Sequence, residues 1–191
     1  MLMDFEKNRE IGQIRFDYLS ILDKSDHHWK IFRSRMKGYI DNCTIYTTIA
    51  YQYYINEDYD KSLIIYDLAR SNDSTCTLAY GNIGWIYYLK GMYDKCIEFS
   101  RKAVRLDTTA LYAHYNIALS YLCLGEFDKA KSKYEQTIRL NKNLGEDIHQ
   151  GAIEDLQNLI KQNHKKAEAE TILTEFFEDS DTKKTIPAKA Q

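Results

Sequence analysis

The sequence contains few of the residues that interrupt helices. It has one proline, Pro187, and eight glycines among 191 residues, so a proline-rich spacer or a glycine-rich flexible chain is not expected. No stretch approaches the roughly eighteen apolar residues that a membrane-spanning helix needs. Charges within the first ten residues come too early for the apolar region of a secretory signal peptide. We therefore expect neither a membrane span nor a leader.

A strong charge excess and a catalytic arrangement are also lacking. The formal net charge of −2 gives no reason to expect a polyanionic partner. His27 and His28 are adjacent, so on a helix they point to different sides and do not share a metal. There is no glycine-rich loop of the kind that cradles phosphate. We expect no catalytic residue, no metal site, no cofactor and no enzyme activity.

The four cysteines have no metal-binding spacing. They are Cys43, Cys76, Cys96 and Cys123, and no two of them form a C-x2-C pair. Cys96 lies where the pattern described next requires a small buried residue, which favours a core thiol over a ligand. The sequence therefore predicts a reduced cytoplasmic protein.

A pattern recurs every thirty-four residues. In residues 77–110, Tyr80, Ile83, Gly84 and Tyr87 lie on one helical face, and Gly91 ends that helix before a second begins. The same pattern occupies residues 43–76 and 111–144, in register and without insertion. It predicts six helices with breaks near residues 57, 73, 91, 107 and 125.

The three copies resemble the tetratricopeptide repeat, which has a thirty-four-residue period and a signature of an aromatic, an aliphatic and a small residue followed by a later proline. The resemblance implies an all-α fold, an α-α superhelix of tetratricopeptide-like helical hairpins. The late proline of the family is missing, because Ser74, Thr108 and Lys142 stand in its place. We expect the turns between repeats to be looser for this reason.

The turn inside each repeat is predicted from its glycine. Gly91 and Gly125 stand at the end of the first helix, where a left-handed residue closes the C-terminus. The first repeat has Glu57 at this place. We therefore expect its neighbour Asn56 to adopt the left-handed conformation.

Helical segments flank the three repeats. Residues 4–42 predict an N-terminal helical hairpin, either a degenerate repeat or an unrelated helical pair. Residues 145–178 predict two C-terminal capping helices, which would cover the apolar end of the third repeat. Residues 179–191 have almost no large apolar residue and predict a disordered tail.

The first helix of each repeat carries a second apolar stripe, offset from the signature residues. In the family this chain resembles, the corresponding positions line a concave groove that holds partners. The predicted partner-binding residues are Tyr51, Tyr54, Trp85, Tyr88, Tyr112, Tyr115 and Leu119. Some family members grip a carboxylate here with Lys, Arg and Asn. The comparable places in this chain hold Thr47, Tyr51, Leu78, Gly81 and Trp85, and Asn82 is the one polar residue near them.

The resemblance and the stripe together predict a non-enzymatic protein–protein interaction module, a scaffold, adaptor or chaperone-like protein. An aromatic groove suits an apolar or amphipathic peptide segment, so its aromatic residues should be at least partly exposed, whereas Tyr87 and Ala103 should lie in the core. The alternative is a self-associating regulatory or assembly subunit, a homodimer with its aromatic face buried. A third possibility is that the chain's own terminal helices fill the groove.

The distribution of charge along the chain raises the question of a nucleic-acid partner. Residues 95–142 hold nine Lys or Arg against five acids, and residues 145–181 hold ten acids against three lysines. Aromatic residues do not interleave the basic positions, so we expect no nucleic-acid partner. An ordinary solvated helix surface accounts for these charges.

Overall fold

The computed structural model describes residues 42–145 and 149–178. Apart from Asn42, the N-terminal hairpin predicted over residues 4–42 lies outside the described residues, as does the tail predicted over residues 179–191. The described residues form α-helices and one π-helical turn, with no strand among them. They divide into two compact units at the boundary between Cys76 and Thr77. The all-α fold and the six predicted repeat helices are confirmed.

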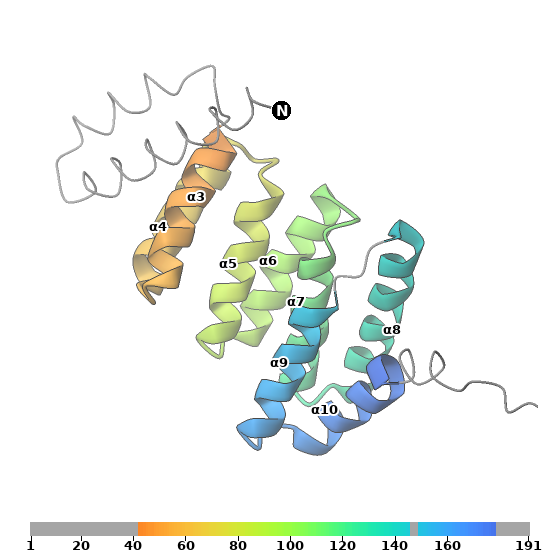
Figure 1. The fold of residues 1–191 in the computed structure, drawn as a ribbon. Coiled ribbons are helices and arrows are strands. Elements are labelled where there is room, and N and C mark those ends of the chain that lie inside the picture. Colours follow the sequence, from red (N-terminus) through yellow and green to blue (C-terminus); the bar gives the residue numbers. More distant parts are fainter. Residues whose placement is uncertain (1–41, 146–148, 179–191) are drawn as a thin grey trace, which may run out of the picture. The chain divides into compact units, whose positions relative to one another are not determined.

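Unit 1 is described from α3 (Asn42–Ile55) and α4 (Tyr59–Asn72) (Figure 1). Tyr46 and Ala50 of α3 are buried, and so are Tyr66 and Ala69 of α4. The two helices come close enough for the buried Ser62 hydroxyl to donate a hydrogen bond of 2.8 Å to the carbonyl of Ala50. Small residues at the crossing therefore permit the close packing of this hairpin.

The turn of unit 1 differs from its prediction. Glu57, not Asn56, adopts the left-handed conformation, with a φ of 60°. Gly91 and Gly125 occupy the corresponding place with φ of 70° and 82°. Asn56 instead donates a side-chain hydrogen bond to the carbonyl of Gln52 at 2.9 Å. The thirty-four-residue register thus fixes which residue is left-handed, even where that residue has a Cβ and pays a steric cost.

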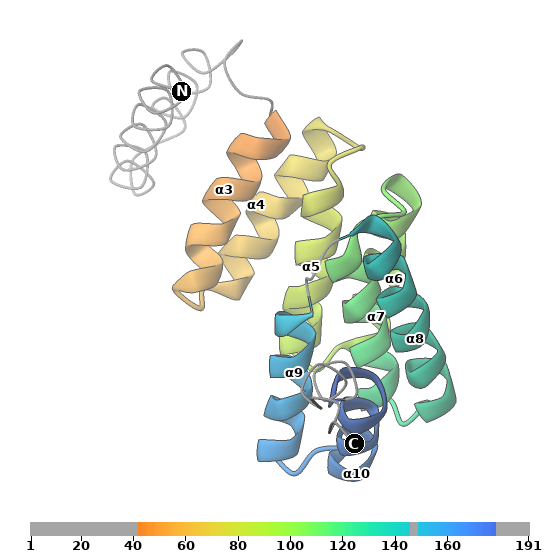
Figure 2. The same cartoon turned by 45° about the vertical axis from the view of Figure 1, so that its right-hand side comes forward.

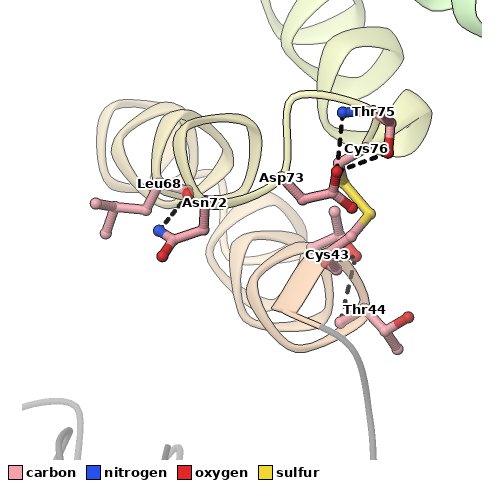
Figure 3. Close-up of a disulfide and its surroundings, with 8 residues drawn as sticks. Cys43, Thr44, Leu68, Asn72, Asp73, Thr75 and Cys76 are labelled. Atoms are coloured by element: carbon pink, nitrogen blue, oxygen red, sulfur yellow. Dashed lines mark hydrogen bonds between the residues drawn. A yellow bond between two sulfur atoms is a disulfide. The ribbon is translucent and has the colours of Figure 1, made fainter.

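A disulfide joins the two ends of the first repeat. Cys43, at the start of α3, is bonded to Cys76, beyond the end of α4 (Figure 3). The expectation that the chain is fully reduced is therefore wrong at these two positions. Cys96 is a free and buried thiol, as predicted.

The loop that carries Cys76 is held by side-chain hydrogen bonds. The Asp73 carboxylate accepts from the Thr75 backbone N–H at 2.9 Å and from the Thr75 hydroxyl at 2.6 Å (Figure 3). Asp107 and Thr109 repeat this arrangement one period later, at 2.8 and 2.6 Å. Aspartate–threonine turns thus organise both loops without the missing proline, and the expected loosening of these two loops is not found.

Unit 2 begins with two hairpins of the same kind. The first is α5 (Thr77–Leu89) and α6 (Tyr93–Leu106), and the second is α7 (Leu111–Cys123) and α8 (Phe127–Leu144). Gly84 lies against Ser100 at the α5–α6 crossing, where an added Cβ would be 2.6 Å from the serine oxygen. This close approach explains the small residue at that signature position.

Unit 2 ends with α9 (Gln150–Lys161), α10 (Lys166–Leu173) and a π-helical turn, η1 (Thr174–Glu178). Both figures show α9 alongside α7, with α10 folding back from its end (Figures 1 and 2). The largest part of the core of unit 2 joins buried residues of α7 and α8 to Ala152, Leu156 and Leu159 of α9. Within the described ranges, no helix has the length and apolar character needed to cross a membrane.

Candidate partner-binding surface

Two stacked aromatic side chains mark the predicted surface on α5. The rings of Trp85 and Tyr88 lie 5.0 Å apart and are nearly parallel. Both side chains are half-buried and pack against the core that α7, α8 and α9 share. Burial raises the pKa of Tyr88, and the thiol of Cys123 lies 3.9 Å from its hydroxyl. Trp85 is therefore partly exposed, as predicted, but it also belongs to the edge of the core.

The N-terminal ends of α5 and α7 carry the more exposed part of this surface. Leu78 is 49% exposed and Tyr112 is 37% exposed. The ring of Tyr112 occupies the space that a Cβ at Gly81 would need. Glycine at this position thus allows the Tyr112 ring to lie on the backbone of α5, and partial burial there raises the pKa of Tyr112 to about 12.

Tyr115 and Leu119 do not provide free surface. Tyr115 is only 7% exposed and Leu119 only 1%, so the expectation that Tyr115 is accessible is wrong. The Tyr115 hydroxyl lies 2.7 Å from Nδ1 of His149, the residue that precedes α9. These side chains are covered because α9 lies over them and shares their core.

The contact between α7 and α9 is formed by two matching apolar stripes. Residues 115, 119 and 122 of α7 follow one another at spacings of four and three, and residues 152, 156 and 159 of α9 have the same spacings. Each stripe lies on one face of its helix, and all six side chains are buried in the same core. Thus α9 is an amphipathic helix seated on the predicted binding face, one of the alternatives that the sequence left open.

A buried polar cluster secures the start of α9. The amide nitrogen of the fully buried Asn141 lies 2.9 Å from Nε2 of His149. The carbonyl oxygen Oδ1 of Asn141 has no hydrogen-bond partner in the described part of the chain. Sequence reasoning did not single out His149, because its role depends on a contact with Tyr115 thirty-four residues away.

Asp155 is the second group that the sequence did not reveal. It lies next to Leu156 on α9, half-buried, and forms no hydrogen bond or ion pair with the described residues. Burial, with a smaller contribution from the charge of Glu154, raises the pKa of Asp155 to about 7. The covered face therefore holds a carboxyl group that is partly shielded from solvent.

Unit 1 has an aromatic pair of its own. Tyr51 is 47% exposed, and its ring stacks on that of Tyr54 with centroids 5.7 Å apart. Tyr54 also contacts the ring of Tyr59 on α4.

A buried histidine contacts a lysine on the basic side of unit 2. His114 is buried, and its Nδ1 lies 2.6 Å from the ammonium of Lys133. Its Nε2 lies 3.0 Å from the carbonyl of Thr108, so the ring donates from Nε2 and accepts at Nδ1. Burial lowers the pKa of both side chains. Among the described residues, no group of three His, Cys, Asp or Glu side chains could hold a metal ion.

Sequence comparison decides the family. Models of the tetratricopeptide repeat match residues 78–109 and 111–144, the second and third predicted copies. These two segments are tetratricopeptide repeats. No curated protein sequence matches it.

Solved structures share the fold of this chain at low sequence identity. BtubC (BKLC) from P. vanneervenii is 16% identical with a TM-score of 0.62, over 98% of this chain and 86% of that one. The TPR2B domain of yeast Sti1, in a complex with pHsp70, is 13% identical with a TM-score of 0.56, over 68% and 97%. The first repeat domain of Spaghetti (RPAP3), bound to the HSP90 peptide SRMEEVD, is 16% identical with a TM-score of 0.53, over 65% and 97%. At these identities the similarity extends to the fold alone.

Proposed function

We propose that this chain is a non-enzymatic protein-binding module, a scaffold, adaptor or chaperone-like protein, that takes an apolar or amphipathic peptide segment on the aromatic face of α5 and α7. The main support for the proposal is that α9 already packs against α7 on this face. An amphipathic helix already lies on this face, with its apolar stripe against that of α7. A surface that accommodates one such helix has the shape and polarity to accept another.

The available part of the face lies beside the covered part. Leu78 and Tyr112 are exposed, and the Trp85–Tyr88 stack is half-exposed at the edge of the core. Aromatic side chains that are partly pre-packed make strong anchors, because little conformational freedom is lost on binding. On α3 of unit 1, Tyr51 and Tyr54 are a further candidate contact.

The ligand is proposed to differ from the acidic HSP90 peptide in the Spaghetti complex. The places that carry a carboxylate clamp in some family members hold here Thr47, Tyr51, Leu78, Gly81 and Trp85, with Asn82 as the one polar residue near them. Thr47 is buried, and its hydroxyl donates to the carbonyl of Cys43 at 2.8 Å. Neither glycine nor leucine has a side chain that donates to a carboxylate. An apolar helix is therefore the better fit.

Selection from a displayed library of helical peptides tests this function. Binding of the selected peptides is measured with wild type, Leu78→Asp and Leu106→Asp. Leu78 lies on the proposed face, and Leu106, which is similarly exposed, ends α6 and is the matched control. Leu78→Asp should weaken binding at least tenfold, and Leu106→Asp should leave it unchanged. Equal affinity for all three chains would contradict the proposal.

A homodimer that buries the same face is the second candidate. The exposure of Leu78 and Tyr112 on neighbouring helices favours it, because clustered apolar side chains often lie at interfaces. Light scattering after size exclusion separates the two candidates, since a dimer would have twice the monomer mass. Leu78→Asp would then return the chain to a monomer.

The cytoplasmic location predicted from the sequence stays a prediction. The bond between Cys43 and Cys76 weighs against it, because structural disulfides persist mainly in oxidising compartments. Thiol labelling of the protein isolated from its native source without reductant would distinguish the two environments.

A further inference from the structure

Helix α9 does not continue the repeat array. Where one repeat follows another, the incoming helix packs against both helices of the preceding hairpin, as α7 does against α6 and α5. Helix α9 packs against α7, whereas α8 is contacted by α10 and η1. Residues 150–178 therefore fold over the second hairpin, with α9 on the face proposed for binding.

The hairpin of α9 and α10 contains two polar side chains that lack a partner among the described residues. Asp155 is half-buried and has no hydrogen bond or ion pair with the described residues, and burial raises its pKa to about 7. Nε2 of His164, beyond the end of α9, is buried without a hydrogen-bond partner in the described part of the chain. Asp155 regains water when the hairpin leaves the face, so the packing of α9 is weaker than its apolar contacts alone would make it.

The connection between α9 and α10 is also strained. Asn163 and Lys165 have φ of 54° and 50°, in the left-handed region that favours glycine. The ion pair between Lys131 of α8 and Glu175 of η1 joins the hairpin to the repeats at 2.7 Å, but the two side chains are 39% and 43% exposed. An exposed pair of this kind contributes little to holding the hairpin in place.

We propose that α9 is a displaceable intramolecular ligand of the α5–α7 face, and that the external partner is an amphipathic helix with the apolar spacing of α9 and an uncharged residue where α9 has Asp155. This proposal rests on the protein-binding function proposed above. The partner and α9 present the same apolar spacing to Tyr115, Leu119 and Leu122. The partner avoids burying a carboxylate, and this difference lets it compete with a helix that is covalently tethered.

A labelled peptide and the full-length chain test this competition. The probe is a fluorescein-labelled peptide of residues 149–161 carrying Asp155→Asn, with binding followed by fluorescence anisotropy. Leu156→Asp places a charge in the middle of the seated stripe and should release α9. Gln157→Asp adds the same charge at an exposed neighbouring position and is the matched control. Leu156→Asp should bind the peptide at least tenfold more tightly than wild type, and Gln157→Asp should match wild type.

A second variant acts in the opposite direction and does not threaten the fold. Asp155→Asn in the full-length chain removes the unpaired carboxyl, so α9 should seat more firmly. Amide exchange within residues 150–161, measured at pH 8, should then slow at least fivefold relative to wild type. Exchange at the wild-type rate or faster, or a Leu156→Asp chain that binds the peptide no more tightly than wild type, would overturn the proposal.

The two proposals fail in different ways. If library-selected peptides are insensitive to Leu78→Asp while the Leu156→Asp chain still captures the α9 peptide, the self-ligand stands and the proposed function falls. If selected peptides depend on Leu78 but neither variant of α9 alters peptide binding or exchange, the function stands and α9 is a fixed part of the fold.

Discussion

The Tyr115 hydroxyl lies 2.7 Å from Nδ1 of His149, and this contact fastens the start of α9 to the face of α7. Tyr115 is one of the residues that the repeat register assigns to the partner groove. Here its polar end is occupied by the chain itself, and its ring lies in the core with Leu156 and Leu159. The relationship links the stability of unit 2 to the accessibility of its binding face.

Tyr115→Phe should destabilise unit 2 by about 1–2 kcal/mol, because it removes this hydrogen bond from a partly buried histidine nitrogen. Urea denaturation gives the free energy of unfolding. Tyr112→Phe is the matched control, since the exposed Tyr112 should change by less than about 0.5 kcal/mol. Equal, small effects of both variants would show that the Tyr115–His149 contact does not hold α9.

The pH dependence of unit 2 should carry the signature of Asp155. The pKa of this carboxyl is raised to about 7 in the folded chain from 3.8, so the folded state binds more protons than the unfolded state between those values. Stability from this group is therefore greatest below pH 4 and is lost as pH rises to about 7. The full difference is on the order of 4 kcal/mol, since each pKa unit corresponds to about 1.4 kcal/mol.

Asp155→Asn should remove that pH dependence and stabilise the chain at pH 8. The measurement is the urea midpoint at pH 5 and pH 8, with Glu170→Gln, at an exposed carboxylate of α10, as the control. If the urea midpoints of wild type and Asp155→Asn change by the same amount between these pH values, the carboxyl is solvated and the prediction is wrong.

Reduction of the disulfide should loosen unit 1 and leave unit 2 unchanged. The bond links residues 33 positions apart, and closing a loop of this size stabilises a fold by about 2–4 kcal/mol. Amide exchange with and without reductant should show faster exchange within residues 43–76 and no change within residues 77–144. Cys96→Ser is the control: because Cys96 is a free thiol, this variant should respond to reductant as wild type does. Uniform exchange before and after reduction would contradict this prediction.

Glu57→Gly should stabilise the first repeat by about 0.5–1 kcal/mol, because glycine adopts the left-handed conformation without a Cβ penalty. Thermal unfolding measures the gain. Asn56→Gly is the matched control and should give no gain, since Asn56 has an ordinary φ and a hydrogen bond to Gln52. A gain at Asn56 instead would indicate that the turn has a different conformation.

The sequence predicted the repeat helices well because their information is local and periodic. The spacing of Tyr80, Ile83 and Gly84 defines a helical face, and Gly91 and Gly125 mark turns that recur at a fixed period. Ala103 is fully buried, as its position in that pattern predicted. The prediction for the Glu57 turn is wrong because the repeat register, and not side-chain preference, decides which residue is left-handed.

The candidate surface was harder to predict because its exposure depends on where a later helix lies. Trp85 and Tyr87 were expected to differ, one exposed and one in the core, yet both are half-buried. Trp85 packs against the core that α9 completes, and Tyr87 packs against Phe99 with the ammonium of Lys95 over its ring. Periodicity assigns a residue to a face of its helix, but it does not say which other helix covers that face.

The disulfide shows the same limit. Cys43 and Cys76 are the first and last residues of one repeat, and their pairing follows from the path of the loop that Asp73 and Thr75 fix. Neither residue belongs to a recognisable spacing motif. The pairing becomes visible only once the repeat has closed on itself.

Amide exchange of the wild-type chain, with and without a helical peptide selected from the library, tests the central claim most directly. If the partner takes the face that α9 covers, exchange should slow within residues 77–89 of α5 and become faster within residues 150–161 of α9. Exchange that slows only within α6 and α8, with α9 unchanged, would place the partner on the opposite side and contradict the account.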